Sequence, residues 1–214
     1  MIAETVRRFA GEPADVRIHT VLRALSCPFG DLLAEVPEGA RLLDYGCGHG
    51  VFAALVAKRS SARVTGVDID EHKVAVARRR VPPPADFSVV EPGQVPPGPW
   101  EAITVVDVLY LLPVHAQRDL LLRLAGELAP GGVLLVKEMH TGSRTKSRWM
   151  QAQERVMVDR LRRTKGDQLA FTDPAHLLHA LEDAGLRTRA RAVDRWYPHP
   201  HHLIVATRPR EVPC

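Results

Sequence analysis

Apolar runs and helix-spaced apolar stripes alternate along the chain from residue 41 to residue 138. Runs typical of buried strands are predicted at 41–45, 63–68, 86–90, 102–107 and 133–138. Apolar residues recur at the spacing of helices at 48–59, 71–80 and 115–128. Strands and helices that alternate at these lengths predict a parallel sheet with helices on both faces.

The two ends of the chain depart from this alternation. Residues 1–38 are expected to form a helical cap over the carboxyl edge of the sheet, with breaks at Pro13 and at Pro28. A helix is expected from Pro174, with Asp173 as its N-cap and Gly185 past its end. A hairpin then closes the chain, with predicted strands at 187–195 and 202–208 around a turn at 196–201. The predicted fold class is therefore α/β: a doubly wound, mostly parallel seven-stranded sheet with an antiparallel last strand.

Length and composition indicate one soluble domain, 1–214. The chain has 214 residues, of which 45% are apolar and 25% are charged. No apolar run approaches the roughly 20 residues of a membrane span, and the first residues lack the apolar core of a secretory signal. Three widely separated cysteines give no disulfide or zinc framework and predict a cytoplasmic location. A net charge of +4 permits a nucleic acid partner but does not require one.

The segment from Leu42 to Gly50, Leu-Leu-Asp-Tyr-Gly-Cys-Gly-His-Gly, joins a predicted strand to a glycine-rich turn. A strand, a glycine turn and a helix form the nucleoside- or phosphate-binding opening of doubly wound sheets. Glycines are needed there because the chain turns sharply and the ligand lies against bare backbone. The dinucleotide pattern G-x-G-x-x-G would require glycine at position 51, which is Val51.

Three further segments follow at the ends of predicted strands. Asp68 ends a short apolar strand eighteen residues past Gly50, where an acid can accept hydrogen bonds from both hydroxyls of a ribose. The strand at 102–107 emerges at Asp107. A Pro-Gly-Gly turn at 130–132 precedes the strand at 133–138.

Taken together, these four motifs resemble those of class I S-adenosylmethionine-dependent methyltransferases, over roughly residues 14–208. The resemblance implies S-adenosyl-L-methionine as the cofactor. It implies that Asp68 holds the ribose, that Ile69 lies against the adenine and that Asp44 and Asp107 flank the methionine part. Glu91 is nearest to the place where many relatives carry an Asp for the adenine amino group. The residues expected at the cofactor are Asp44, Gly46, Cys47, Gly48, Gly50, Asp68, Ile69, Glu91 and Asp107.

Methyl transfer from a sulfonium needs in-line approach and exclusion of water more than covalent help. If a base is used, the candidates are His140, His199 and His201, which are expected at the carboxyl edge of the sheet. Glu138 leaves the fifth strand on the same side. The alternative is that His199 and His201 only shape a proline-rich turn. No metal site is expected, because no carboxylate or cysteine stands at ligand spacing from these histidines.

An amphipathic helix is predicted at 146–163, within an insertion at 140–170 that would lie as a lid over the acceptor. Its basic residues favour a solvated helix face, with an anionic acceptor, a carrier protein, a phospholipid surface or RNA as the alternatives. The function predicted is methyl transfer to an oxygen or carbon of a small-molecule acceptor.

Two alternative functions stay open from the sequence. One is an RNA- or protein-modifying methyltransferase, although no N-P-P-Y-like tetrad follows the fourth strand, which continues Asp107-Val108-Leu109-Tyr110. The other is a regulatory protein that binds the cofactor without turnover. A nicotinamide dehydrogenase is disfavoured by Val51 and by the Pro-Gly-Gly turn. A nucleic acid partner is not expected, and the sequence makes no prediction of oligomeric state.

Overall fold

The computed structural model describes residues 2–139, 170, 172–193 and 201–210. The strands are β1 (Arg41–Tyr45), β2 (Arg63–Asp68), β3 (Ala85–Val89), β4 (Trp100–Val106), β5 (Leu128–Met139), β6 (Arg187–Ala192) and β7 (His201–Thr207). The helices are α1 (Ile2–Arg7), α2 (Ala14–Ser26), α3 (Phe29–Leu33), α4 (Val51–Arg59), α5 (Glu71–Arg80), the 3-10 turn η1 (Leu109–Leu111), α6 (Val114–Gly126) and α8 (Pro174–Asp183).

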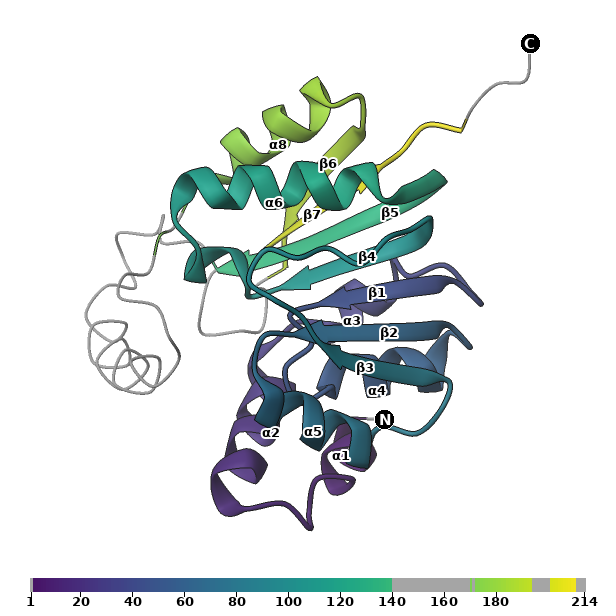
Figure 1. The fold of residues 1–214 in the computed structure, drawn as a ribbon, viewed down its shortest axis with the longest axis vertical. Coiled ribbons are helices and arrows are strands. Elements are labelled where there is room, and N and C mark those ends of the chain that lie inside the picture. Colours follow the sequence, from purple (N-terminus) through teal and green to yellow (C-terminus); the bar gives the residue numbers. More distant parts are fainter. Residues whose placement is uncertain (1, 140–169, 171, 194–200, 211–214) are drawn as a thin grey trace.

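All seven strands belong to one sheet, in the order β3-β2-β1-β4-β5-β7-β6 (Figure 1). Strands β1 to β5 are parallel, whereas β7 is antiparallel to both of its neighbours, β5 and β6. The fold class predicted from the sequence is confirmed. Because β6 runs in the same direction as β5, it ends at the carboxyl edge of the sheet, where β1, β2 and β4 also end.

Each face of the sheet is buried against a separate set of helices. Residues such as Leu42 and Leu135 face the N-terminal helices, α4 and α5, and their core includes Phe52. Their chain neighbours Leu43 and Leu134 face α6 and α8. Alternate residues of a strand point to opposite faces, so the continuous apolar runs of β1, β4 and β5 are those of strands covered on both sides.

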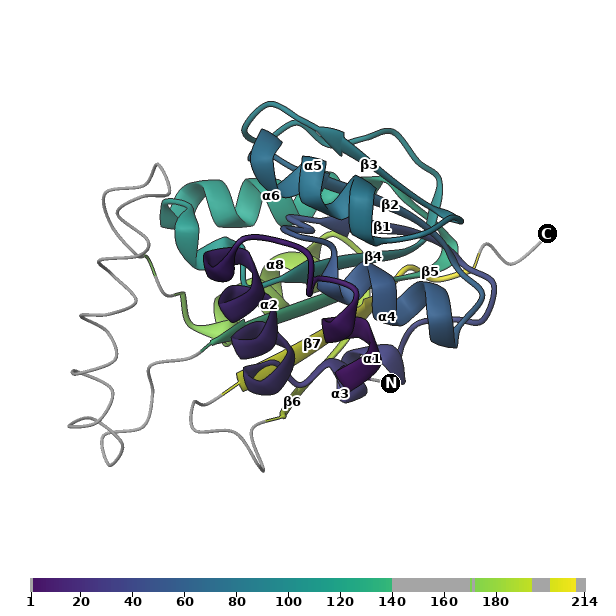
Figure 2. The same ribbon diagram turned by 90° about the horizontal axis from the view of Figure 1, so that it is seen from below.

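The N-terminal helices pack beside α4 (Figure 2). Helix α2 begins after Pro13 and α3 after Pro28, the two prolines at which breaks were predicted. Phe29 stacks on Phe52 of α4 with ring centroids 5.4 Å apart. Near the end of α2, Arg23 donates a hydrogen bond of 2.8 Å to the carbonyl oxygen of Val106, the last residue of β4. The helix α2 is thereby attached to the carboxyl edge of the sheet.

Strand β5 begins at Leu128, earlier than the predicted start at 133, and the helix predicted over 115–128 ends at Gly126. Leu128 pairs with Trp100, and the β4–β5 register then shifts before Val133 pairs with Ala102. The Pro-Gly-Gly segment lies within the strand because the backbones of Gly131 and Gly132 bond to Arg208 at 2.9 Å. Tertiary pairing thus extends the strand through residues whose local preference is a turn.

Other element boundaries also differ from the predictions, two of them at residues of the expected site. The helix predicted from residue 48 begins at Val51, because Gly48 and Gly50 have φ angles of 54° and 80°, outside the helical region. His201, predicted in the hairpin turn, is the first residue of β7, where it pairs with Met139 and accepts a 2.8 Å hydrogen bond from Val193. The helix predicted at 146–163 lies outside the described residues. Within the described part of the chain, no helix has the length and apolarity needed to cross a membrane.

The start of α8 provides a test of local structure. The carboxylate of Asp173 accepts a 2.9 Å hydrogen bond from the amide of Ala175, with Pro174 in the first turn. Asp173→Ala should lower the free energy of unfolding by about 1 kcal/mol, since an N-cap acceptor is lost. Urea denaturation followed by circular dichroism measures it. Asp183→Ala, at the opposite end of the helix, should cause no loss; equal losses in both variants would contradict the capping role.

Candidate active site

The turn after β1 presents open backbone at the carboxyl edge. The amides of Gly46 and Cys47 both donate to the carbonyl of Val67, at 2.8 and 3.0 Å, which fixes the turn against β2. At Gly46, with a φ of 76°, a Cβ atom would lie only 2.3 Å from a methyl group of Val108. At Gly48, a Cβ would meet no described atom within 4 Å. The turn is therefore packed on one side and leaves its backbone accessible to a ligand on the other.

Asp68 connects the end of β2 to this turn. One carboxylate oxygen accepts a 2.8 Å hydrogen bond from the amide of Gly48, and the other accepts from the amide of Asp70 at 3.0 Å. Each oxygen retains acceptor capacity for a ribose hydroxyl. Ile69, 51% exposed, follows Asp68 directly. Glu91 is also exposed, and the residue before it, Val90, donates to the carbonyl of Asp68 at 3.1 Å.

Asp44 is buried beneath the turn, with 2% of its surface exposed. One of its oxygens accepts a 2.8 Å hydrogen bond from the hydroxyl of Thr104, and the other is buried with no partner among the described residues. Burial raises the pKa of Asp44 to about 6, against the lowering effect of the Thr104 hydrogen bond. A buried carboxylate oxygen without a donor is suited to an ammonium group of a ligand, such as that of a methionine moiety.

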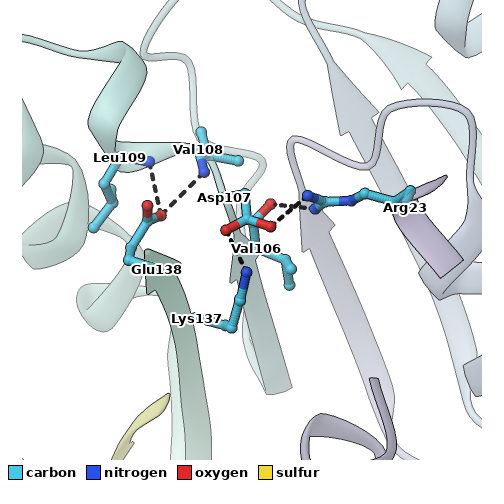
Figure 3. Close-up of polar contacts among 7 residues, drawn as sticks. All are labelled: Arg23, Val106, Asp107, Val108, Leu109, Lys137 and Glu138. Carbon is cyan, nitrogen blue, oxygen red and sulfur yellow. Dashed lines mark hydrogen bonds and ion pairs between the residues drawn. The ribbon is translucent and has the colours of Figure 1, made fainter. Parts of the chain in front are cut away.

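Asp107 lies between two cations at the end of β4 (Figure 3). One oxygen is 2.5 Å from the ammonium of Lys137, and the other is paired with the guanidinium of Arg23. Burial raises the pKa of Asp107, but the two cations outweigh it and hold that pKa below its usual value. Both oxygens are engaged within the protein, and the expected contact of Asp107 with the cofactor stays a prediction.

Glu138 is the second acid at this edge. One of its oxygens accepts hydrogen bonds from the amides of Val108 and Leu109, at 3.0 and 2.9 Å (Figure 3). Burial, and then the nearby charge of Asp107, raise the pKa of Glu138 to about 8, although the two amides lower it. The carboxyl group is therefore mostly protonated at neutral pH, in contrast to Asp107 beside it.

The three histidines predicted as candidate bases have different outcomes. His140 and His199 lie outside the described residues. His201 is in β7, 2% exposed, and is among the residues that lower the pKa of Asp107. It therefore lies near the acidic and basic groups of the edge, and its catalytic role stays a prediction. Among the described residues, no group of three His, Cys, Asp or Glu side chains is arranged to hold a metal ion.

Sequence reasoning missed Arg23, Lys137 and Thr104. Lys137 has a signal in the sequence: it follows the apolar run Val133–Val136 and is followed by Glu138, so two charges end a strand that is otherwise apolar. Thr104 is a lone polar residue inside the apolar strand β4. Arg23 has no local signal, because it is one of many arginines and its partner lies 84 residues away.

These features define a class of protein. A seven-stranded sheet with an antiparallel last strand, a glycine turn after β1 and an acid at the end of β2 are the features of a class I S-adenosylmethionine-dependent methyltransferase. A family model described as a methyltransferase domain matches residues 18–190, and the chain belongs to this family.

One relative is the trans-aconitate 2-methyltransferase of Streptomyces avermitilis. It is 33% identical over 195 residues, which cover 85% of this chain and 70% of the relative. The predicted enzyme class is confirmed, and methylation of a small-molecule acceptor agrees with such relatives.

Two solved structures show the same fold. An O-methyltransferase family protein from Burkholderia thailandensis superposes with a TM-score of 0.70 at 22% identity, over 96% of this chain and 63% of that one. The magnesium protoporphyrin IX methyltransferase from Synechocystis, with bound S-adenosylhomocysteine, has a TM-score of 0.64 at 19% identity, over 96% and 93% of the two chains. At these identities the similarity concerns the fold alone.

Replacing Asp107 tests the ion pairs at the end of β4. Asp107→Asn should lower the free energy of unfolding by about 3–5 kcal/mol at pH 7, because the buried charge of Lys137 loses its counter-charge. Since the pKa of Asp107 is lowered in the folded state, its stabilising contribution is present above the unfolded pKa and is lost as the pH falls through the folded one.

Denaturant unfolding at pH 7 and at progressively lower pH measures this effect. Glu4→Gln is the control, because it removes an acid from an exposed ion pair with Lys58 and should change stability little. If Asp107→Asn costs no more than Glu4→Gln, Asp107 is not held as a buried, charged partner.

Asp44→Asn should have opposite effects on stability and on cofactor affinity. The folded pKa of Asp44 is raised, so its ionised form destabilises the fold above about pH 6, and stability rises as the pH falls from 7 towards the unfolded pKa. Without ligand, the variant should be more stable than wild type at pH 7 and should lack this pH dependence.

The same variant should bind S-adenosylhomocysteine on the order of 10- to 100-fold more weakly, because a charge-assisted hydrogen bond is lost. Titration calorimetry measures the affinity, and thermal unfolding at pH 7 and pH 5 measures the stability. Asp86→Asn, at an exposed position of β3, is the control. Unchanged affinity in Asp44→Asn would exclude contact of Asp44 with the ligand.

Proposed function

We propose that this protein transfers a methyl group from S-adenosyl-L-methionine to a carboxylate oxygen of a small polycarboxylic acid, with trans-aconitate as the first candidate. Several relatives named trans-aconitate 2-methyltransferase support the choice of acceptor, for instance one 34% identical over 81% of this chain. An aconitate anion has carboxylate oxygens as its strong nucleophiles, so the acceptor atom proposed is oxygen rather than carbon.

The residues of the carboxyl edge fit the proposed cofactor. The unpartnered oxygen of Asp44 is suited to the ammonium of the methionine part. The open backbone of Gly48 and the carboxylate of Asp68 lie together at 2.8 Å, as a ribose would require. Ile69 and Glu91 follow β2 and β3 at the same edge and are proposed on the adenine side. When bound, the cofactor supplies an electrophilic methyl group on a sulfonium.

The observation that carries the anionic acceptor is the charge balance at the ends of β4 and β5. Two cations, Arg23 and Lys137, face the single charged acid Asp107. Burial keeps the pKa of Glu138 near 8, so this acid contributes little negative charge at neutral pH. Arg23, Lys137, Asp107 and Glu138 together therefore carry an excess of positive charge. Asp44, which also interacts electrostatically with Arg23, is the acid proposed to pair with the ammonium of the cofactor. An acceptor that approaches the two cations is accordingly expected to be an anion rather than a cation.

A carboxylate acceptor also reduces the chemistry required of the protein. It is already ionised at neutral pH, so no base is needed to generate the nucleophile. The role left to the chain is to bind and orient the acceptor in line with the methyl group and to exclude water. His140, His199 and His201 would then act in binding the anion, if they act at all, rather than in removing a proton.

We further propose that residues 1–214 act as one methyltransferase domain in the cytoplasm. The location is supported by Cys27 and Cys47, both free thiols in the structure. Transfer to RNA or protein, and cofactor binding without turnover, are the competing functions and are separate outcomes of the experiment below.

The experiment uses methyl-labelled S-adenosylmethionine with trans-aconitate, citrate, a monocarboxylic acid, total RNA and total protein as acceptors. We expect label in a base-labile methyl ester of trans-aconitate, at a higher kcat/KM than for the monocarboxylic acid. Asp68→Ala tests the cofactor assignment separately from the acceptor. The loss of its hydrogen bonds should weaken S-adenosylhomocysteine binding on the order of 10- to 100-fold. Label only in RNA or protein would overturn the acceptor, and tight cofactor binding with no label in any pool would favour the regulatory alternative.

A further inference from the structure

A small cavity lies between the sheet and helices α6 and α8, at the carboxyl ends of β4 and β5 and the amino end of β7. Its volume is about 20 Å³, enough for one water molecule. Its polar lining comes from η1, α6, β5, the segment before α8, and β7, and its apolar lining includes residues of η1, β5, α8 and β7. The polar lining residues are Tyr110, Gln117, Glu138, Thr172 and His202.

The wall of the cavity is held by specific hydrogen bonds. The buried amide group of Gln117 donates to the carbonyls of Leu112 and Ala170, at 2.9 and 2.7 Å. Ala170 in turn donates its backbone N–H to the carbonyl of Tyr110 at 2.9 Å. These contacts bring the segment before α8 against the turn after β4, so the cavity is a built feature of the fold.

Two buried polar atoms on the cavity lining lack a partner among the described residues. They are the second carboxyl oxygen of Glu138 and the hydroxyl oxygen of Thr172. A buried polar group without a hydrogen bond destabilises the fold, and a water molecule that bonds to two such groups removes that cost.

Glu138 is linked through its first oxygen to the cofactor side of the sheet. That oxygen accepts hydrogen bonds from the amides of Val108 and Leu109 (Figure 3). A methyl group of Val108 occupies the space where a Cβ atom on Gly46 of the glycine turn would lie. A chain of contacts therefore runs from Glu138 through Val108 to the backbone that would carry the cofactor.

We propose that Glu138 is a positioning residue for methyl transfer: it fixes the Asp107–Leu109 turn against the glycine turn and, through one water in the cavity, ties that turn to Thr172 ahead of α8. The expected effect on the rate of methyl transfer rests on the function proposed above. The expected effect on the structure of residues 107–109 does not depend on that function.

The charges around Glu138 favour a water over a cation in the cavity. Lys137, its chain neighbour, acts electrostatically on the carboxyl group of Glu138, so its positive charge also disfavours a cation bound beside that group. A protonated carboxyl group can accept from the two amides with one oxygen and donate to the water with the other. The charges that shift the pKa of Glu138 are those of Asp107, directly after β4, and of Lys137 on β5. Tyr110 on η1 and His202 on β7 are the other titratable residues that line the cavity.

Two substitutions separate the role of the carboxyl group from its bulk. Glu138→Gln keeps an oxygen that accepts from both amides and an N–H that donates into the cavity. Glu138→Leu keeps a similar volume but removes every hydrogen bond. Glu127→Leu is the matched control, because Glu127 also accepts from a backbone amide, that of Gly98 at 2.5 Å, at the opposite edge of the sheet.

Three measurements need no acceptor. Amide hydrogen exchange at Val108 and Leu109 should be slow in wild type and Glu138→Gln, and at least tenfold faster in Glu138→Leu. Affinity for S-adenosylhomocysteine should fall about tenfold in Glu138→Leu only. Infrared spectra of the wild type should show a protonated carboxyl band that titrates near pH 8, absent from Glu138→Gln and shifted in Thr172→Val, which removes one partner of the water.

Turnover gives the fourth readout. With trans-aconitate as the probe acceptor, kcat should fall on the order of 10- to 100-fold in Glu138→Leu and stay within about twofold of wild type in Glu138→Gln. The proposal is overturned if Glu138→Leu shows wild-type exchange at Val108 and Leu109, or if Glu138→Gln is impaired as much as Glu138→Leu. If trans-aconitate is not methylated by the wild type, the first three measurements still decide the role of Glu138, while the proposed acceptor fails on its own.

Discussion

The carboxylate of Asp107 is the group on which the carboxyl edge of this protein depends. Its two cationic partners come from different parts of the chain, Arg23 from α2 and Lys137 from β5. A buried ion pair is favourable only when the desolvation of each charge is offset by its partners. The pairs therefore require α2, β4 and β5 to keep one relative arrangement. Helix α2 is for this reason part of the carboxyl edge and not a separate N-terminal extension.

Three buried acids at this edge have different protonation because their partners differ. Asp107 has two cations and its pKa is lowered, whereas Asp44 has only the hydroxyl of Thr104 and its pKa is raised to about 6. Glu138 has two amides but lies beside the charge of Asp107, and its pKa is about 8. One edge thus combines an acid with a lowered pKa, an acid suited to an incoming ammonium and an acid with a raised pKa that can donate a hydrogen bond when protonated.

The glycine turn after β1 and the turn after β4 are joined by packing. Gly46 leaves room for the methyl group of Val108, and the amide of Val108 is held by Glu138. Asp68 holds the amide of Gly48 from the next strand. A displacement of the turn after β4 would therefore also displace the glycine turn. Glu138 has no described contact with the glycine turn, and this indirect coupling is the physical basis for assigning it a role.

The sequence by itself determined the alternation of elements, the sheet class and the motif residues Asp44, Gly48 and Asp68, because these depend on short-range periodicity and on backbone geometry that only glycine adopts easily. It also placed the helix caps at Asp173 and Gly185. Tertiary structure decided what depends on contacts between distant residues. Leu128 and the Pro-Gly-Gly segment belong to β5 because they pair with β4 and with the segment around Arg208. His201 belongs to β7 because it pairs with β5. Folding alone placed Arg23 on Asp107, since no local pattern identifies a partner 84 residues away.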